Sequence, residues 1–143
     1  TNTKGESSVP LIKKLSTEGI QINATAILTY KQVKSVAEAL SKDTQNIISV
    51  FAGRLADTGV DPVPLMKQSQ ALVNQYPQAS LLWASSRELL NVFQAENLGI
   101  DIITVTNPIL EKMKMIGLDP TELSLDTVKG FHNDVKALGF SIL

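Results

Sequence analysis

The stretch "NIISVFAGRLADTG", residues 46–59, is mostly apolar in its first half and contains glycine and charged residues in its second half. The apolar run from Ile47 to Phe51 is typical of a buried strand, and that strand must end where Gly53 and Arg54 follow. An arginine therefore stands just past the carboxyl end of a predicted strand, in a chain that has only one other arginine.

Three further segments have the same strand-like character: 20–28, 80–84 and 100–105. Each of the four strands is followed by a helical pattern, and one more helical pattern opens the chain. The helices are expected from Ser8 to Gly19, around Val33–Leu40, from Asp61 to Pro77, from Ser86 to Gly99, from Asn107 to Gly117, and from Ser124 onward. This alternation predicts a parallel sheet with right-handed crossovers, in a single domain over residues 1–143.

Two architectures fit four strand–helix units: an open doubly wound sheet, or part of a (β/α)8 barrel. No strand is followed by the glycine-rich dinucleotide fingerprint, which counts against the first. The strands also carry pairs of residues that share one face. These pairs, which we expect together on the inner face of the half-barrel, are Asn23 and Thr25, Ser49 and Phe51, and Trp83 and Ser85. A sheet between two helix layers should be apolar on both faces, so the polar members favour a barrel interior.

The composition bounds the possible functions. The chain is 43% hydrophobic and 19% charged with a net charge of −1, which gives no electrostatic footprint for nucleic acid or a membrane surface. Cysteine is absent, which excludes disulfides and thiolate metal sites. With no apolar span and a polar start, the default location is the cytoplasm.

The two arginines, Arg54 and Arg87, each follow a predicted strand. The carboxyl ends of strands form the functional face of α/β proteins, and arginine is favoured over lysine where a planar fork must hold a phosphate. Small residues precede both arginines, and a helix beginning after Ser86 would offer free N–H groups to an anion. We therefore predict a phosphate clamp; the alternative is a pair of surface arginines in salt bridges.

Other polar residues are interpreted as structural. His132 is the only histidine and lies on the last predicted helix. Asp57 and Asp61 flank a glycine-containing loop, but two carboxylates are weak evidence for a metal site. Asp61 is better explained as a helix cap and Asp57 as a partner of Arg54, while Trp83 is interpreted as packing.

Five motifs stand at or after the predicted strands and in the last predicted helix: "GIQINATAILTYKQ" (19–32), "ISVFAGRLAD" (48–57), "WASSRE" (83–88), "TNPILEKM" (106–113) and "LSLDTVKGFHNDV" (123–135). Together they resemble the second half of the transaldolase family, which includes fructose-6-phosphate aldolase. The resemblance implies four βα units, the second half of a (β/α)8 barrel, plus a C-terminal helix. A complete barrel of this type needs about 250 residues.

The resemblance also implies a Schiff-base mechanism without a cofactor or metal. A lysine attacks a ketose phosphate, carbon–carbon cleavage releases an aldose phosphate, and a dihydroxyacetone unit passes to an aldehyde, as in the pentose phosphate pathway. The matching positions are a polar pair near the Schiff base, side chains that line the substrate site, and arginines that bind phosphate: Asn23 and Thr25; Ser49, Phe51 and Ser85; Arg54 and Arg87. Thr25 would help to hold the catalytic water.

The imine-forming lysine is the main departure. In the family it lies on the strand immediately before the position that matches Thr1, so the resemblance implies that this chain lacks it. Lys4, Lys13 and Lys14 are poor substitutes, because a Schiff-base lysine needs a desolvated site. We therefore expect the isolated chain to be inactive and to pair with an N-terminal half-barrel or with further copies of itself.

Two alternatives stay open. One is a lyase of the fructose-6-phosphate aldolase type, which tends to carry tyrosine where Phe51 stands; phenylalanine is more similar to transaldolase proper. Val50 also replaces a proline that is usual after the serine of this motif. The other alternative is a non-catalytic half-barrel that binds sugar phosphates.

Overall fold

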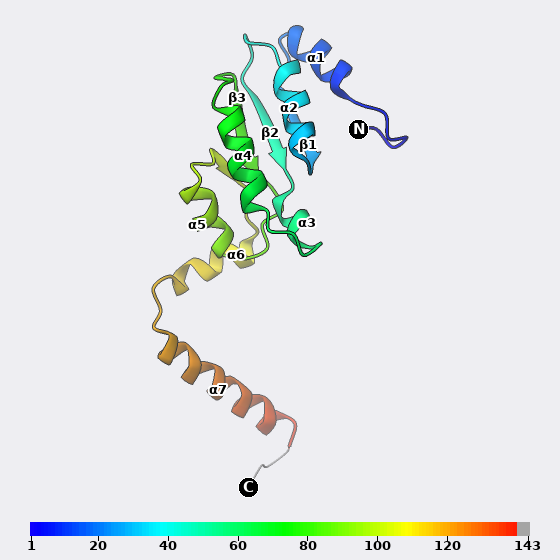
Figure 1. The fold of residues 1–143 in the computed structure, drawn as a ribbon. Coiled ribbons are helices and arrows are strands. Elements are labelled where there is room, and N and C mark those ends of the chain that lie inside the picture. Colours follow the sequence, from blue (N-terminus) through cyan, green and yellow to red (C-terminus); the bar gives the residue numbers. More distant parts are fainter. Residues whose placement is uncertain (140–143) are drawn as a thin grey trace. The chain divides into compact units, whose positions relative to one another are not determined.

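A computed structural model describes residues 1–139 and divides the chain into two compact units, Thr1–Leu110 and Glu111–Leu143. The first unit holds a parallel sheet with α2 and α4 packed against it, and the second contains one long helix (Figure 1). The single domain expected over residues 1–143 stays a prediction.

The first unit contains most of the secondary structure. Its elements are α1 (Val9–Thr17), β1 (Asn23–Ile27), α2 (Tyr30–Ala39), β2 (Asn46–Val50), α3 (Ala52–Ala56), α4 (Val63–Val73), β3 (Ala79–Trp83), α5 (Leu90–Asn97), β4 (Ile102–Ile103) and the start of α6 (Asn107–Glu111). The second unit holds the end of α6, the 3-10 helix η1 (Lys112–Met115) and α7 (Pro120–Ala137).

The sheet confirms the four predicted strands. Their order is β1-β2-β3-β4 and every neighbouring pair is parallel. The carboxyl ends of all four strands therefore lie at one edge of the sheet, where the arginine-bearing segments begin. The fold is thus α/β with consecutive strand–helix units, as predicted, while closure into half of a barrel stays a prediction.

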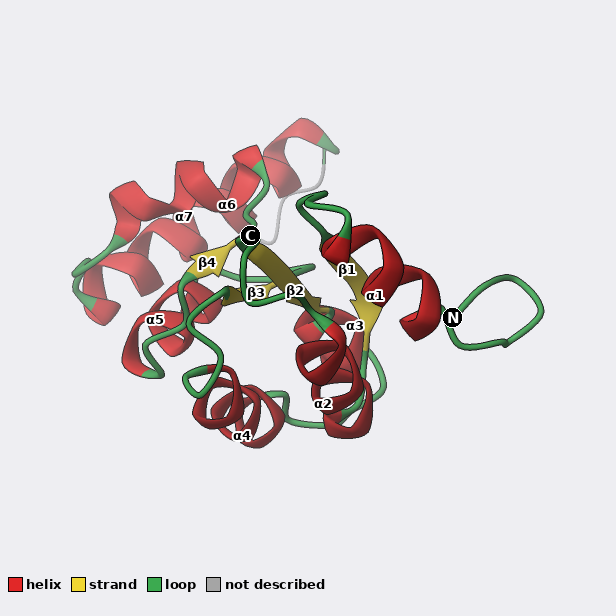
Figure 2. Ribbon diagram, turned by 90° about the horizontal axis from the view of Figure 1, so that it is seen from above, coloured by secondary structure: helices red, strands yellow, loops and turns green. Residues whose placement is uncertain are grey.

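One face of the sheet is covered by helices. α2 packs against β1 and β2, α4 against β3, and α5 against β4, and Figure 2 shows α2 and α4 on the same side of the sheet. The core between these layers is made of apolar side chains that are almost fully buried: Val33, Val36, Ile48, Val50, Met66, Leu81 and Trp83. Burial of this face is the main source of stability for the first unit.

The opposite face carries the polar positions. Asn23 and Thr25 are exposed on β1, and Ser49 follows on β2. Trp83 does not join them, contrary to the expectation that it shares a face with Ser49. It is in register with Val50, whereas Ser49 is in register with Leu82, so its indole lies in the helix-covered core. Alternation within one strand does not determine its register with the next strand, which explains the error.

Two helices begin at other residues than predicted. α5 begins at Leu90 rather than after Ser86, whose Oγ instead donates to the carbonyl oxygen of Thr104 at 2.5 Å. α7 begins at Pro120, because the carboxylate of Asp119 accepts from the backbone N–H groups of Thr121 and Glu122. Ser124 therefore lies inside α7 and is not its cap. Competing side-chain caps of this kind are hard to rank from sequence.

Other helix starts follow the sequence more closely. Asp61 Oδ1 accepts from the backbone N–H of Val63, the first residue of α4, at 2.9 Å, although the capping position predicted for Asp61 is taken by Pro62. At α1 the acceptor is Ser7 Oγ, 3.3 Å from the N–H of Val9, and Ser8 makes no capping bond. The short helix α3 directly after β2 was not predicted.

Candidate active site

The segments that directly follow β2 and β3 are in contact at Gly53 and Ser85. A Cβ atom added to Gly53 would lie 1.5 Å from the carbonyl oxygen of Ser85, and the Gly53 N–H donates to the carbonyl oxygen of Ala84 at 3.3 Å. Only glycine fits such a close approach of two backbones. Arg54 follows Gly53 directly and Arg87 lies two residues after Ser85, so this contact brings the two arginine-bearing segments side by side.

Ser85 has an unusual backbone conformation. Its φ is +65°, in the left-handed region that serine seldom occupies. This conformation turns the chain directly after β3, and it directs the Ser85 carbonyl toward Gly53. Backbone strain of this kind is often found at functional sites, where the surrounding structure maintains it.

Arg87 forms a two-point ion pair with Asp57. Its Nε donates to Asp57 Oδ1 at 2.9 Å and its Nη2 donates to Asp57 Oδ2 at 2.5 Å. Both side chains are about half exposed, 47% for Arg87 and 49% for Asp57. The hydrogen bonds from Arg87 lower the pKa of the Asp57 carboxyl, and the positive charge of Arg54 lowers it further. Asp57 therefore pairs with Arg87, and the expectation that it pairs with Arg54 is wrong.

The backbone of Arg87 is also held in place. The buried Asn91 accepts from the N–H groups of Arg87 and Glu88 through its Oδ1, at 2.8 and 3.2 Å. These are amides that were expected to open a helix and to attract an anion. Because Asn91 occupies them and α5 begins only at Leu90, that part of the predicted anion site is wrong.

Arg54, Arg87 and Asp57 together carry one net positive charge. Arg54 lies exposed in α3, close enough to Asp57 for its charge to act on that carboxyl. Two guanidinium groups and one carboxylate leave one positive charge in excess. Such an arrangement can bind an anion, because each guanidinium offers several hydrogen-bond donors.

A second group of predicted residues lies on the face of the sheet opposite α2 and α4. Ser49 Oγ donates to Asn23 Oδ1 at 2.6 Å, which joins β2 to β1 through side chains. Ser49 is almost fully buried, and this bond satisfies its hydroxyl hydrogen. The structure therefore brings Asn23 and Ser49 together. Among residues 1–139, no side-chain hydrogen bond or ion pair connects this pair to Arg54 or Arg87.

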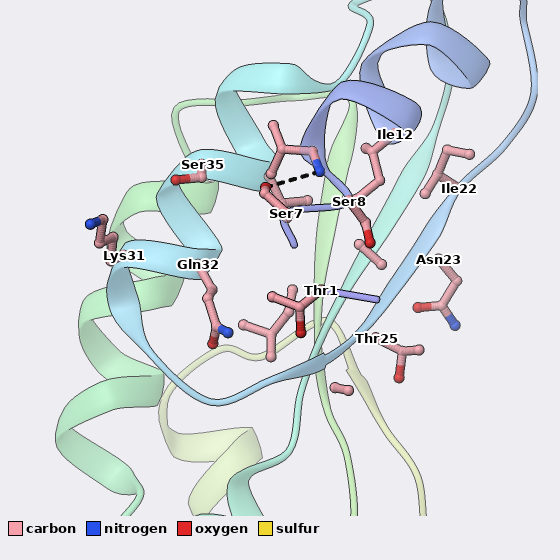
Figure 3. Close-up of a pocket in the computed structure, with 15 residues that line it drawn as sticks. Thr1, Ser7, Ser8, Ile12, Ile22, Asn23, Thr25, Lys31, Gln32 and Ser35 are labelled. Carbon is pink, nitrogen blue, oxygen red and sulfur yellow. Dashed lines mark hydrogen bonds between the residues drawn. The ribbon is translucent and has the colours of Figure 1, made fainter. Parts of the chain in front are cut away.

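Thr25 lies on the edge strand, beside a pocket of about 440 Å³. The pocket runs between α1, α2 and β1, and Asn23 and Thr25 both line it (Figure 3). In that view they lie on the side of β1 away from Lys31 and Ser35 of α2. The register between β1 and β2 shifts after Ala24, and Ala26 has φ +59°, so the strand bulges next to Thr25.

Phe51 connects β2 to α3. It is half-buried, and its backbone N–H donates to the carbonyl oxygen of Ile27 at 2.8 Å. The predicted substrate-lining residues Ser49, Phe51 and Ser85 therefore occupy a buried strand position, the end of the same strand, and the strained turn after β3.

Residues 1–139 contain no group of three or more histidine, aspartate or glutamate side chains that could hold a metal ion. None of the helices in this part of the chain has the length and hydropathy needed to cross a bilayer. His132 lies on α7 in the second unit.

Comparison with known proteins points in one direction. The family model described as "Transaldolase/Fructose-6-phosphate aldolase" matches residues 3–142. This chain belongs to that family. Among curated relatives, a "Probable transaldolase" of Nitrosopumilus maritimus is 31% identical over 131 residues, covering 87% of this chain and 57% of the relative. Proteins of the same name from Streptococcus equi subsp. zooepidemicus (36% over 100 residues; 69% and 45% covered) and Caldicellulosiruptor saccharolyticus (34% over 113 residues; 78% and 49% covered) also match.

The chain spans about half the length of these transaldolase relatives. Membership of the family confirms the resemblance on which the predicted site residues depend.

One residue that shapes this site of a transaldolase-family chain, Asn91, was missed by sequence reasoning. Asp57 was predicted to take part, but with Arg54 as its partner instead of Arg87. Asp57 lies three residues after Arg54, a spacing that suggests a pair on one helix, whereas its real partner is 30 residues away. The signal that could have located Asn91 is its position four residues after Arg87, where an asparagine can accept from the backbone of a turn.

Proposed function

We propose that the protein is a transaldolase-type transferase, and that this chain supplies its phosphate-binding part. In this reaction a lysine forms a Schiff base with a ketose phosphate, and cleavage of a carbon–carbon bond releases an aldose phosphate. The dihydroxyacetone unit left on the lysine is then transferred to an aldehyde. The names of the curated relatives support this proposal.

The observation that carries the proposal is the contact between Gly53 and Ser85. It places two arginine-bearing segments together at the carboxyl edge of a parallel sheet, which is the functional edge of such folds. Because Asp57 cancels only one of the two positive charges, the site favours an anionic group. We propose that Arg54 and Arg87 share the phosphate of the sugar substrate, with Ser85 beside them.

The face of the sheet opposite α2 and α4 would hold the rest of the sugar. Ser49 Oγ donates to the side-chain oxygen Oδ1 of Asn23. This bond orients the Asn23 side-chain amide so that its NH2 group can donate to a substrate hydroxyl. Thr25 would help to hold the water that takes part in proton transfer, and Phe51 would line the site as an apolar ring. These roles follow the positions that match the family.

The lysine is proposed to come from outside residues 1–143. All eleven lysines of this chain are exposed, whereas an imine-forming lysine needs a desolvated site that favours its neutral form. β1 lies at the edge of the sheet, where a further parallel strand can pair with it. We propose that residues 1–143 form half of a barrel, are inactive alone, and are completed by an N-terminal half-barrel or by another copy.

The test of the phosphate site uses Arg54→Ala and Arg87→Ala in the complete enzyme. A charge-assisted hydrogen bond contributes about 1.5–3 kcal/mol, so each change should raise the KM for fructose 6-phosphate roughly ten- to a hundredfold. Lys67→Ala, which removes an exposed cation from α4, is the control and should leave KM unchanged. An unchanged KM in the Arg87→Ala enzyme would show that the phosphate binds elsewhere.

A lyase of the fructose-6-phosphate aldolase type is the second candidate, because the matching family model covers both activities. Phe51 favours the transferase. An apolar ring gives the water near the Schiff base no phenolic partner, which should favour transfer to an aldehyde over protonation and release. The complete enzyme should therefore transfer dihydroxyacetone to erythrose 4-phosphate faster than it releases the free ketone. Equal rates with and without the aldehyde would favour the lyase.

A further inference from the structure

Arg87 is held at its backbone and at the end of its side chain. Asn91 accepts from its backbone N–H at 2.8 Å, and Asp57 holds its guanidinium group through two hydrogen bonds. A long side chain that is half exposed is ordinarily free to change rotamer, and these contacts limit that freedom.

The way in which Asp57 binds Arg87 leaves part of the guanidinium group available. A guanidinium has two edges that can each donate a pair of parallel hydrogen bonds: one formed by Nε and a terminal nitrogen, the other by the two terminal nitrogens. Asp57 accepts from Nε and Nη2, which is the first edge. The second edge, formed by Nη1 and Nη2, keeps the geometry that a phosphate group requires.

We propose that Asp57 is a positioning residue, which holds the guanidinium group of Arg87 with its terminal edge ready for the phosphate of the substrate. This inference rests on the proposed function, since it assumes that Arg87 binds phosphate. It assigns to Asp57 a part in substrate affinity, although its carboxylate repels the anion and does not touch it.

The opposite role, in which Asp57 competes with phosphate for Arg87, fits the geometry less well. A competitor should occupy the edge that the ligand uses, and Asp57 takes the other one. Arg54 also lies close enough to act on the Asp57 charge, so the three groups together stay positive. A guanidinium group that is already fixed loses less side-chain entropy when the phosphate binds. This gain should outweigh the repulsion of the phosphate by the Asp57 carboxylate, which is already paired.

The experiment compares Asp57→Asn and Asp57→Glu with Asp126→Asn in the complete enzyme. Asp126 forms an exposed ion pair with Lys129 on α7, at 3.1 Å, so its change removes the same charge from a similar pair in the second unit. The readouts are kcat, the KM for fructose 6-phosphate, and the inhibition constant of inorganic phosphate. Melting temperatures show whether each variant is folded.

For Asp57→Asn we expect KM and the phosphate inhibition constant to rise together, roughly three- to tenfold, with kcat within about twofold. Asp57→Glu keeps the carboxylate and should restore part of the affinity, and Asp126→Asn should change neither constant. Constants that stay the same or fall in Asp57→Asn overturn the proposal, and a fall indicates competition. A kcat that falls in both Asp57 variants indicates general structural damage and also overturns it.

Arg87→Ala separates this inference from the proposed function. If Arg87→Ala leaves both constants unchanged, Arg87 does not bind phosphate, and the proposed function fails together with the role of Asp57. If Arg87→Ala raises both constants but Asp57→Asn does not, Arg87 binds phosphate without help from Asp57, and only this inference fails.

Discussion

Replacing Gly53 by alanine tests the contact that brings the arginine-bearing segments together. The new Cβ would lie 1.5 Å from the Ser85 carbonyl oxygen and 2.6 Å from its carbonyl carbon, which is 1.9 Å and 0.8 Å short of the 3.4 Å at which ordinary contact begins. Both neighbours are backbone atoms of a turn with φ +65°, so no flexible side chain can move aside. Overpacking of this kind typically costs 1–3 kcal/mol, and we expect about 3 kcal/mol here.

Urea unfolding of the complete protein measures the effect. With slopes of about 1–3 kcal/mol per molar for small proteins, Gly53→Ala should lower the midpoint by about 1 M or more. Gly130→Ala is the matched control, because Gly130 lies inside α7 with no atom within 4 Å of its added Cβ. In a helix interior this same substitution should stabilise, by about 0.5–1 kcal/mol.

The two glycine variants should therefore shift stability in opposite directions. Gly53→Ala should also raise the KM for fructose 6-phosphate, because the segments that carry Arg54 and Arg87 must move apart. A Gly53→Ala protein with wild-type stability and wild-type KM would refute the reasoning. It would mean that the two loops are not in contact.

Three further predictions concern Asn91, Phe51 and Asp119. Asn91→Ala should destabilise the protein by about 1–3 kcal/mol in urea unfolding, because two backbone N–H groups lose their acceptor, whereas Asn91→Asp should cost less. Phe51→Tyr should increase release of free dihydroxyacetone relative to transfer, measured with and without erythrose 4-phosphate. The backbone hydrogen bond from Thr121 lowers the pKa of Asp119 below its ordinary value of 3.8. The cap formed by Asp119 should therefore stabilise α7 fully above pH 3.8, and this stabilisation should be lost as the pH falls below 3.8. Asp119→Ala should remove this part of the pH dependence of the helical circular dichroism signal.

The positions of the four strands along the chain could be predicted, because the hydrophobic pattern of a strand is local in the sequence. Each strand is short and rich in apolar residues, and each of the four predicted segments overlaps an observed strand. The alternation within β1 and β2 also placed Asn23 and Ser49 on one face, as their hydrogen bond confirms. Register between strands is not local, and this is why Trp83 was assigned to the wrong face.

The site shows the same limit. The position of Arg87 after a strand could be predicted, but its ion pair with Asp57 joins residues 30 positions apart, and the close approach of Gly53 to Ser85 joins residues 32 positions apart. No spacing rule predicts such pairs without knowledge of how the loops pack. The caps of α5 and α7 were misplaced for a related reason. Several serines and aspartates near each start were able to cap, and tertiary contacts such as that of Ser86 with Thr104 decided which of them did.

Trapping the Schiff base tests the central claim most directly. The complete protein is incubated with fructose 6-phosphate and sodium borohydride, which reduces an imine to a stable amine, and the modified peptide is located by mass spectrometry. We predict one stoichiometric adduct on a lysine outside residues 1–143 and none on the eleven lysines from Lys4 to Lys136. A stoichiometric adduct on any of those eleven lysines, or no adduct at all, would contradict the account.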